Sequence, residues 1–274
     1  TTHNCLLAFL ESQRKIRHIS KKSNELRRLI KKRKTTLDNI SIENWEGKSD
    51  SAFRKEQFRF ERVRNAYDAK KNYIKTLLIS KGFNSFDYNL FLRALKKEEL
   101  LEVWIKKEKD LTYQLLTTYD FCKNSGQLGP KRMEGDGQIP EGFYHISHFN
   151  PKSNFLLSLK LNYPNDSDKI LSDPINPGSN IYVHGGCQTK GCIPLTNDKI
   201  QELYLLAMEA KKEGEKIPIH IFPTKKFREN LNKDSEHFPF WENLKTVFDD
   251  FEENRKLSFI AVESDGRYKI KVRD

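Results

Sequence analysis

Residues 181–195 combine an apolar run, three glycines, two cysteines and a histidine, and they constrain the fold more than any other segment. The apolar residues 181–183 predict a buried strand. The glycines that follow His184 permit a sharp turn and a close approach of the backbone to a substrate. Thr196 is a suitable N-cap for a helix over residues 197–212. The segment therefore predicts a strand, a tight loop and a helix.

The loop carries a candidate nucleophile and a candidate base. The thiolate is the reactive form of cysteine, and a nearby imidazole can accept the thiol proton. Cys192 and His184 are eight residues apart and would form such a pair. The positive end of the helix after Thr196 and the charge of Lys190 are both expected to lie near Cys192, where they would stabilise a thiolate.

These residues resemble the signature of L,D-transpeptidases of the YkuD type, in which a His-Gly pair is followed by Ser/Thr-x-Gly-Cys. Residues 189–192, Thr-Lys-Gly-Cys, match the second half, although the histidine common at the position of Lys190 is absent. The short spacing from His184 to Cys192 resembles the YafK-like murein branch. Further matches cover roughly residues 50–225 and lie, in order, at residues 101–104, 129–130, 135–137, 139–142, 150–153 and 161–165.

The resemblance implies acyl transfer on peptidoglycan stem peptides through a thioester on Cys192. His184 would act as general base and then as acid, oriented by the backbone carbonyl of Gly185. The N–H groups of Gly191 and Cys192 would stabilise the oxyanion. No metal or cofactor is expected. The side chains expected to contact substrate are those of Thr189, Lys190, Asn150, Ser153 and Tyr163.

The acceptor of the acyl group stays open at this stage. An amine of another stem gives a 3–3 cross-link, and the same chemistry at meso-diaminopimelate can attach a protein. Water instead gives an L,D-carboxypeptidase, or an amidase that releases a protein attached to the stem. The chemistry is the same up to the second step, so the sequence does not choose.

The cysteines and histidines also allow other interpretations. His184, Cys187 and Cys192 are possible zinc ligands, together with His145 or His148, in a zinc-stabilised nucleic-acid-binding protein. A disulfide between Cys187 and Cys192 would block the nucleophile and require an awkward closure. Cys187 is therefore expected to be a small packing residue. A catalytically silent wall-binding module is a further alternative.

The net charge of +11 is concentrated near the N-terminus, where residues 14–34 contain eleven Lys or Arg and a single acid, Glu25. An anionic membrane surface or an anionic wall polymer fits this segment, and a wall-attached protein is another possible partner. The segment has no aromatic residue to stack on bases, so no nucleic acid is expected. The alternative is a solvated helix face.

The cysteine pattern does not indicate a disulfide scaffold. No apolar run reaches transmembrane length. Because the chain begins with Thr1, a signal or anchor is expected to have been removed. The expected location is the periplasm or cell envelope.

The expected fold class is α+β: a mostly β L,D-transpeptidase catalytic domain, an N-terminal helical hairpin and a C-terminal α/β cap. The expected domains are residues 1–88, 89–224 and 225–274. The hairpin would pair a basic helix over residues 4–34 with a helix over residues 51–82. The cap would hold an aromatic-rich helix near residues 238–251 and a hairpin of residues 257–261 and 268–272. The expected strands of the catalytic domain are residues 90–95, 100–105, 111–119, 142–146, 155–161, 181–184 and 217–222.

Overall fold

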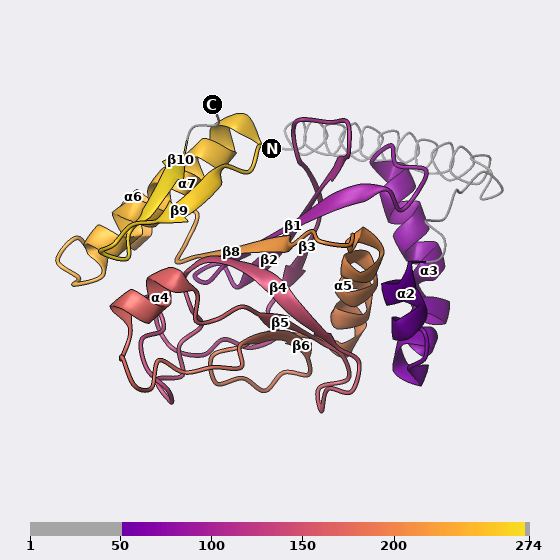
Figure 1. The fold of residues 1–274 in the computed structure, drawn as a ribbon, viewed down its shortest axis with the longest axis horizontal. Helices are drawn as coiled ribbons and strands as arrows, with labels where there is room; N and C mark the ends of the chain where they lie inside the picture. Colours follow the sequence, from indigo (N-terminus) through magenta and orange to yellow (C-terminus); the bar gives the residue numbers. More distant parts are fainter. Residues whose placement is uncertain (1–50, 272–274) are drawn as a thin grey trace, which may run out of the picture. The chain divides into compact units, whose positions relative to one another are not determined.

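The computed structural model describes residues 51–271 (Figure 1). The chain divides into two compact units, Thr1–Trp45 and Glu46–Asp274, and the description below concerns the second. The basic helix expected over residues 4–34 lies outside the described residues. The division expected at residues 88 and 224 stays a prediction. None of the helices within residues 51–271 has both the length and the apolar character needed to cross a bilayer.

A mixed sheet of eight strands forms the centre of the described unit, in the order β3-β2-β1-β8-β4-β5-β6-β7. Neighbouring strands are antiparallel except for the parallel pairs β1–β8 and β6–β7. The expected α+β class with a mostly β catalytic part is confirmed. The strands are β1 (Tyr88–Leu95), β2 (Leu100–Lys107), β3 (Gln114–Asp120), β4 (Gly142–Asn150), β5 (Ser158–Leu161), β6 (Tyr182–Gly185), β7 (Ile193–Leu195) and β8 (Ile217–Phe222).

The helix expected over residues 51–82 is two helices, α2 (Ala52–Gln57) and α3 (Glu61–Ser80). The Ser51 side chain caps α2 by accepting a hydrogen bond from the Arg54 N–H. The break lets Phe58 turn its ring against Tyr67. Arg64 satisfies the carbonyls of Phe58 and Arg59 that the break exposes. Figure 1 shows α3 beside α5 (Asn197–Ala210), the helix that covers one face of the sheet.

Three short elements were not expected from the sequence. α4 (Asp166–Leu171) begins with a capping box between Asn165 and Asp168, and α6 is Phe227–Asn230. β7 lies at the edge of the sheet and contains Pro194. An edge strand tolerates the missing proline N–H, so this proline does not prevent pairing with β6.

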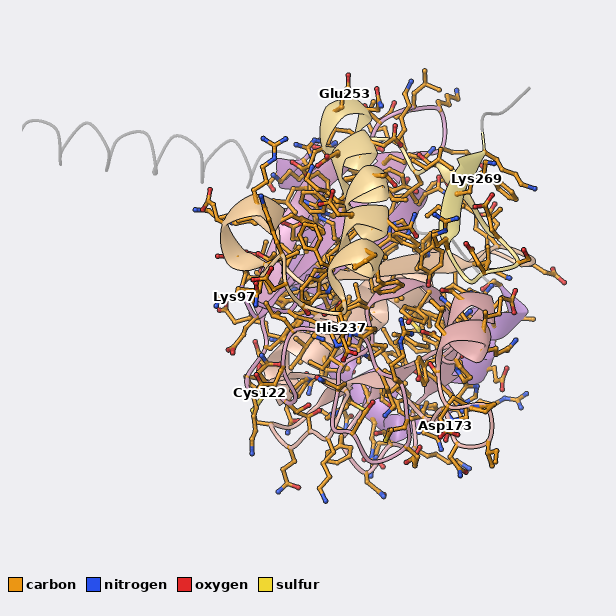
Figure 2. All side chains as sticks on the ribbon, turned by 90° about the vertical axis from the view of Figure 1, so that its left-hand side faces the viewer. Lys97, Cys122, Asp173, His237, Glu253 and Lys269 are labelled. Atoms are coloured by element: carbon orange, nitrogen blue, oxygen red, sulfur yellow. A yellow bond between two sulfur atoms is a disulfide. The ribbon has the colours of Figure 1, made fainter. Side chains whose placement is uncertain are left out.

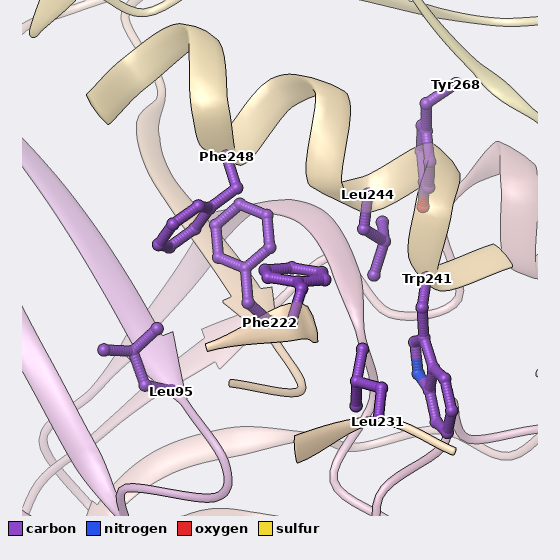
Figure 3. Packing of buried hydrophobic residues seen from close by; sticks show 8 residues of the cluster. Leu95, Phe222, Leu231, Trp241, Leu244, Phe248 and Tyr268 are labelled. Carbon is purple, nitrogen blue, oxygen red and sulfur yellow. The ribbon is translucent and has the colours of Figure 1, made fainter. Parts of the chain in front are cut away.

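The C-terminal segment packs on the sheet. It consists of α7 (Phe238–Asn254) and the hairpin of β9 (Phe259–Val262) and β10 (Tyr268–Lys271). Figure 3 shows Trp241, Leu244 and Phe248 on the same side of α7, above Phe222 and Leu95 of the sheet. These apolar residues are three and four positions apart, the spacing that places side chains on one face of a helix. The aromatic helix and closing hairpin expected in this region are confirmed up to residue 271.

A buried ion pair connects the sheet, the loop before β4 and the C-terminal helix. Lys96 Nζ lies 2.9 Å from Glu141 Oε1, and both side chains are almost completely buried. Glu141 also accepts hydrogen bonds from the Gly129 N–H and from Trp241 Nε1, at 2.8 Å and 2.7 Å. Lys96 donates further to two backbone carbonyls. Glu141 is therefore the counter-ion of Lys96 and the hydrogen-bond acceptor of the Gly129 N–H and the Trp241 indole.

We therefore expect Glu141→Ala to lower the free energy of unfolding by about 3–5 kcal/mol, because it leaves the Lys96 ammonium group buried and without its counter-ion. Chemical denaturation followed by circular dichroism measures the change. Glu242→Ala removes an exposed acid from the same helix as Trp241 and should change stability by less than about 0.5 kcal/mol. A loss below about 1 kcal/mol for Glu141→Ala would contradict the role given to this pair.

Candidate active site

The parallel pair β6–β7 brings Cys192 and His184 to one face of the sheet. His184 lies in β6 and pairs with Pro194 of β7, and Cys192 directly precedes β7. Extending this register by two residues places Cys192 opposite Tyr182. Side chains two residues apart along a strand share a face, so Cys192 and His184 are diagonal neighbours. The two side chains are therefore expected to project from the same face of neighbouring strands.

The imidazole of His184 is held in one tautomer. Its Nδ1 lies 2.8 Å from the carbonyl oxygen of Gly185, which can only accept a hydrogen bond, so Nδ1 carries the proton. Nε2 is then unprotonated and free to act as a base. Burial lowers the pKa of His184 below its ordinary 6.5, and the hydrogen bond to Gly185 only partly opposes this. The ring is therefore neutral at pH 7.

Phe155 covers one face of this imidazole. The two rings are stacked, with centroids 4.5 Å apart and planes 30° apart. The turn that presents Phe155 is held by Ser153, whose Oγ accepts a hydrogen bond from the Phe155 N–H at 3.1 Å. The stack therefore restricts rotation of the His184 ring and keeps water from one of its faces.

The thiol of Cys192 is the free cysteine among the described residues. Its Sγ lies 3.7 Å from the carbonyl oxygen of Asn180, to which it donates. Burial raises the pKa of Cys192, while the backbone N–H of Tyr182 and the charge of Lys131 lower it. Because the thiol pKa is raised and the imidazole pKa is lowered, the site holds a neutral pair at pH 7. Attack by sulfur then requires proton transfer to a base.

Two expectations about the electrostatics of Cys192 are wrong. The ammonium group that favours its thiolate belongs to Lys131, whereas Lys190 is exposed. The start of α5 is also separated from Cys192 by the three residues of β7, because an extended strand rises about 3.3 Å per residue. Asn197 at the start of α5 instead lies beside Gly185, at the opposite end of the β6–β7 pair.

The two N–H groups expected to stabilise an oxyanion have partners in this structure. The Gly191 N–H donates to Ser125 Oγ at 2.8 Å, and the Cys192 N–H donates to Thr189 Oγ1 at 2.9 Å. The Thr189 hydroxyl in turn donates to the Cys192 carbonyl. A substrate oxyanion would have to replace these hydroxyls, so the oxyanion role stays a prediction.

Three residues expected to contact substrate have local structural contacts. Asn150 Oδ1 accepts the Lys152 N–H, and Ser153 shapes the turn before Phe155. Tyr163 is buried and donates its hydroxyl hydrogen to the Pro177 carbonyl at 2.7 Å. Their expected contact with substrate stays a prediction, as does that of Thr189 and Lys190.

Cys187 is not a simple packing residue, because it forms a disulfide with Cys122. The two Cα atoms are 5.4 Å apart, and the cysteines are separated by 65 residues in the sequence. Figure 2 labels Cys122 on the lower left of the view, well below the end of α7 at Glu253. The bond removes Cys187 from any zinc site with His184 and Cys192. Within residues 51–271, His, Cys, Asp and Glu side chains form no group of three or more that could hold a metal ion.

Several residues around Cys192 were missed by the sequence analysis. Lys131 follows the Gly-Pro pair of residues 129–130, a segment already recognised as a family match, and it is buried against Asp136. Asn180 carries no sequence signal, because only its carbonyl contacts the thiol. Cys122, Ser125 and Phe155 are distant in the sequence, and only the fold brings them to this site.

The family comparison agrees with this geometry. The YkuD family, described as the L,D-transpeptidase catalytic domain, matches residues 94–221. A protein of Escherichia coli K12 described as a putative L,D-transpeptidase, YafK, is 32% identical over 186 residues, which are 66% of this chain and 73% of that protein. The chain belongs to the YkuD-type L,D-transpeptidase family. The same values hold for YafK of Escherichia coli O157:H7.

Three solved structures resemble this chain more distantly. The helical cell shape determining protein Pgp2 of Campylobacter jejuni is 17% identical, with 65% of this chain and 73% of that chain covered and a TM-score of 0.41. Bd1075 of Bdellovibrio bacteriovorus is 24% identical, with 61% and 58% covered and a TM-score of 0.37. L,D-transpeptidase 1 of Mycobacterium tuberculosis is 16% identical, with 49% and 62% covered and a TM-score of 0.28.

Proposed function

We propose that this protein catalyses acyl transfer on peptidoglycan stem peptides through a thioester on Cys192. The observation that carries the proposal is the hydrogen bond from His184 Nδ1 to the Gly185 carbonyl. It leaves Nε2 basic on the face of the sheet that also presents Cys192. Membership of the L,D-transpeptidase family supplies the substrate class.

The reaction begins with transfer of the Cys192 thiol proton to His184 Nε2. The thiol must first rotate away from the Asn180 carbonyl, to which it donates in this structure. Sulfur then attacks the carbonyl carbon of meso-diaminopimelate in a tetrapeptide stem. As the tetrahedral intermediate collapses, the imidazolium ion gives its proton to the leaving amine of the terminal amino acid. The product of this half-reaction is a thioester and a neutral imidazole.

The negative oxygen of the tetrahedral intermediate would be stabilised by the N–H groups of Gly191 and Cys192. Hydroxyl groups of Ser125 and Thr189 occupy these donors in this structure, so the donors already lie beside polar acceptors. An oxyanion accepts a stronger hydrogen bond than a neutral hydroxyl does, which favours the exchange in the transition state. Thr189, Lys190, Asn150, Ser153 and Tyr163 remain our candidates for contacts with the rest of the stem.

The second half-reaction depends on the acceptor. His184 is again neutral and can deprotonate either an amine of another stem or a water molecule. The first acceptor gives a 3–3 cross-link or an attached protein, and the second gives carboxypeptidase or amidase activity.

We place the reaction in the periplasm or cell envelope, where peptidoglycan lies. The basic segment of residues 14–34, which lies outside the described residues, is our candidate for contact with an anionic membrane or wall polymer.

Incubation of the full chain with purified muropeptides, followed by mass spectrometry, tests the proposal. A new dimer that has lost one terminal amino acid identifies transpeptidation, and a monomer shortened by that amino acid identifies carboxypeptidase activity. Release of a protein from a stem conjugate identifies the amidase. If none of these three products forms, and no acyl adduct is detected on Cys192, the proposed function is wrong.

A further inference from the structure

The loop between β6 and β7 is fastened at two points to the segment that follows β3. The first point is the disulfide between Cys187 and Cys122. The second is the hydrogen bond of 2.8 Å from the Gly191 N–H to Ser125 Oγ. The two points lie on either side of Thr189 in a loop of few residues, and the second is adjacent to Cys192. The loop that carries the candidate nucleophile is therefore supported from outside itself.

The supporting segment is itself held firmly. The Cys122 N–H donates to the Pro194 carbonyl of β7 at 3.1 Å. Farther along, the Gln127 N–H donates to the side-chain oxygen of Gln138 at 2.7 Å. One end of the segment is thus joined to the strand that follows Cys192, and the other is joined to the loop before β4. The segment can therefore act as a rigid support.

The loop also packs tightly on this part of the molecule. Gly191 has a φ of +110°, a conformation that favours glycine. A Cβ at this position would lie 2.7 Å from the backbone carbonyl oxygen of Gln138. The hydrogen bonds of Thr189 to Cys192, by contrast, lie within the loop and cannot fix its position relative to the sheet. Together with the β6–β7 pairing, the external contacts therefore set where Cys192 Sγ lies relative to His184.

Resting on the proposed function, we propose that Cys122, Cys187 and Ser125 are positioning residues for Cys192. They hold the loop before the attack, so that the thiol can meet His184 Nε2 when substrate binds. The Gly191 N–H leaves Ser125 Oγ for the oxyanion only once sulfur has attacked. A displacement of the reacting atoms by about 1 Å can slow a reaction about a hundredfold, so a small movement of the loop is sufficient. Cys187 is exposed, so a reductant from solvent can reach the disulfide. The oxidised protein is then the active form.

Reduction with tris(2-carboxyethyl)phosphine removes the first contact without adding a thiol that could act as an acceptor. The phosphine gives two electrons and becomes the phosphine oxide, water supplies its oxygen and the two protons, and Cys122 and Cys187 become thiols. All proteins carry Cys5→Ser, so that this cysteine cannot pair with the freed thiols. The set consists of this parent, Cys122→Ala/Cys187→Ala, Ser125→Ala, Ser125→Thr and the control Ser264→Ala, which changes an exposed serine in the β9–β10 turn.

Two measurements are made at a temperature at which circular dichroism shows every variant to be folded. Hydrogen exchange of peptides that cover residues 186–192 reports the loop without any substrate. We expect faster exchange there in the double alanine variant, in the reduced parent and in Ser125→Ala. Muropeptide turnover should show kcat lowered about tenfold or more in the double variant, with KM changed by less than about twofold. Reduction should have the same effect on the parent and no further effect on the double variant.

Ser125→Ala should also lower kcat. Ser125→Thr retains the hydroxyl group and should restore both exchange and kcat, whereas Ser264→Ala should resemble the parent. Unchanged exchange in the double variant and in Ser125→Ala would show that the contacts do not hold the loop. Faster exchange with an unchanged kcat would overturn the positioning role. If the parent itself turns over no muropeptide and forms no acyl adduct on Cys192, the proposed function is wrong. In that case, faster exchange accompanied by a changed rate of Cys192 alkylation supports the positioning role, and an unchanged alkylation rate overturns it.

Discussion

Replacing Cys192 by alanine is expected to reduce muropeptide turnover by about a million-fold, the scale of loss when the nucleophile of an acyl-transfer enzyme is removed. No other described cysteine is available, because Cys122 and Cys187 are bonded to each other. The side chain is only partly buried, and its polar contacts are with backbone groups of Asn180 and Tyr182. We therefore expect the fold to be retained. Mass spectrometry of the intact protein should detect an acyl adduct in the parent and none in Cys192→Ala.

The control is Cys5→Ala, which changes a cysteine outside the described residues and should leave turnover within about twofold of the parent. Turnover by Cys192→Ala above about a hundredth of the parent rate would show that another group is the nucleophile. A small packing residue, as the sequence analysis expects Cys187 to be, could be replaced by alanine with most of the activity retained. The disulfide to Cys122 reverses that expectation, because the substitution now also releases the loop.

Replacing His184 by alanine is expected to slow acylation by about a hundredfold or more at pH 7, the usual contribution of general-base catalysis. The reason is the raised pKa of Cys192, which keeps the thiol protonated at this pH unless a base accepts the proton. Alkylation of Cys192 by iodoacetamide should slow in parallel. The matched control is His148→Ala, which removes an exposed imidazole from β4 and should leave both rates unchanged.

The pH dependence distinguishes a base from a merely structural histidine. The parent should lose activity only as the pH falls through the pKa of His184, which lies below the ordinary 6.5 because burial disfavours the imidazolium ion. In His184→Ala only the thiolate can attack, so the rate should rise about tenfold for each pH unit until the raised pKa of Cys192 is reached. Rates measured from pH 5 to 10 give both profiles. A flat defect of equal size at every pH would contradict the role of His184 as a base.

The parts of the fold with strong local patterns were predictable from the sequence. β8 begins and ends where the apolar run of residues 217–222 does, because a buried strand needs little besides that run. The start of α5 was also predicted, because the cap at Thr196 is a local signal. β7 was missed because three residues around Pro194 show no strand periodicity of their own. It forms a strand through its pairing with β6, which is a tertiary interaction.

Some residues of the candidate site were likewise predictable from a local motif, and others are brought there only by the fold. Cys192, His184 and Gly185 lie within one short segment, so a family motif could identify them. The hydrogen bond between His184 and the Gly185 carbonyl follows from that local geometry. The disulfide partner of Cys187 is 65 residues away, and nothing in the sequence specifies that pairing. The stacking of Phe155 on His184 and the charge of Lys131 near Cys192 likewise depend on the folded arrangement of distant loops.

The hydrogen bonds from Lys96 and Trp241 to Glu141 join α7 to the core of the sheet, so a shortened protein that lacks α7 loses part of this buried network. The family match ends at residue 221, but Leu95 inside it and Phe222 directly after it pack against side chains of α7. A gene fragment that stops at that boundary would expose this apolar surface to water and remove one hydrogen-bond donor from a buried carboxylate. We therefore expect that a fragment ending at residue 221 does not fold on its own, because α7 completes part of its buried core.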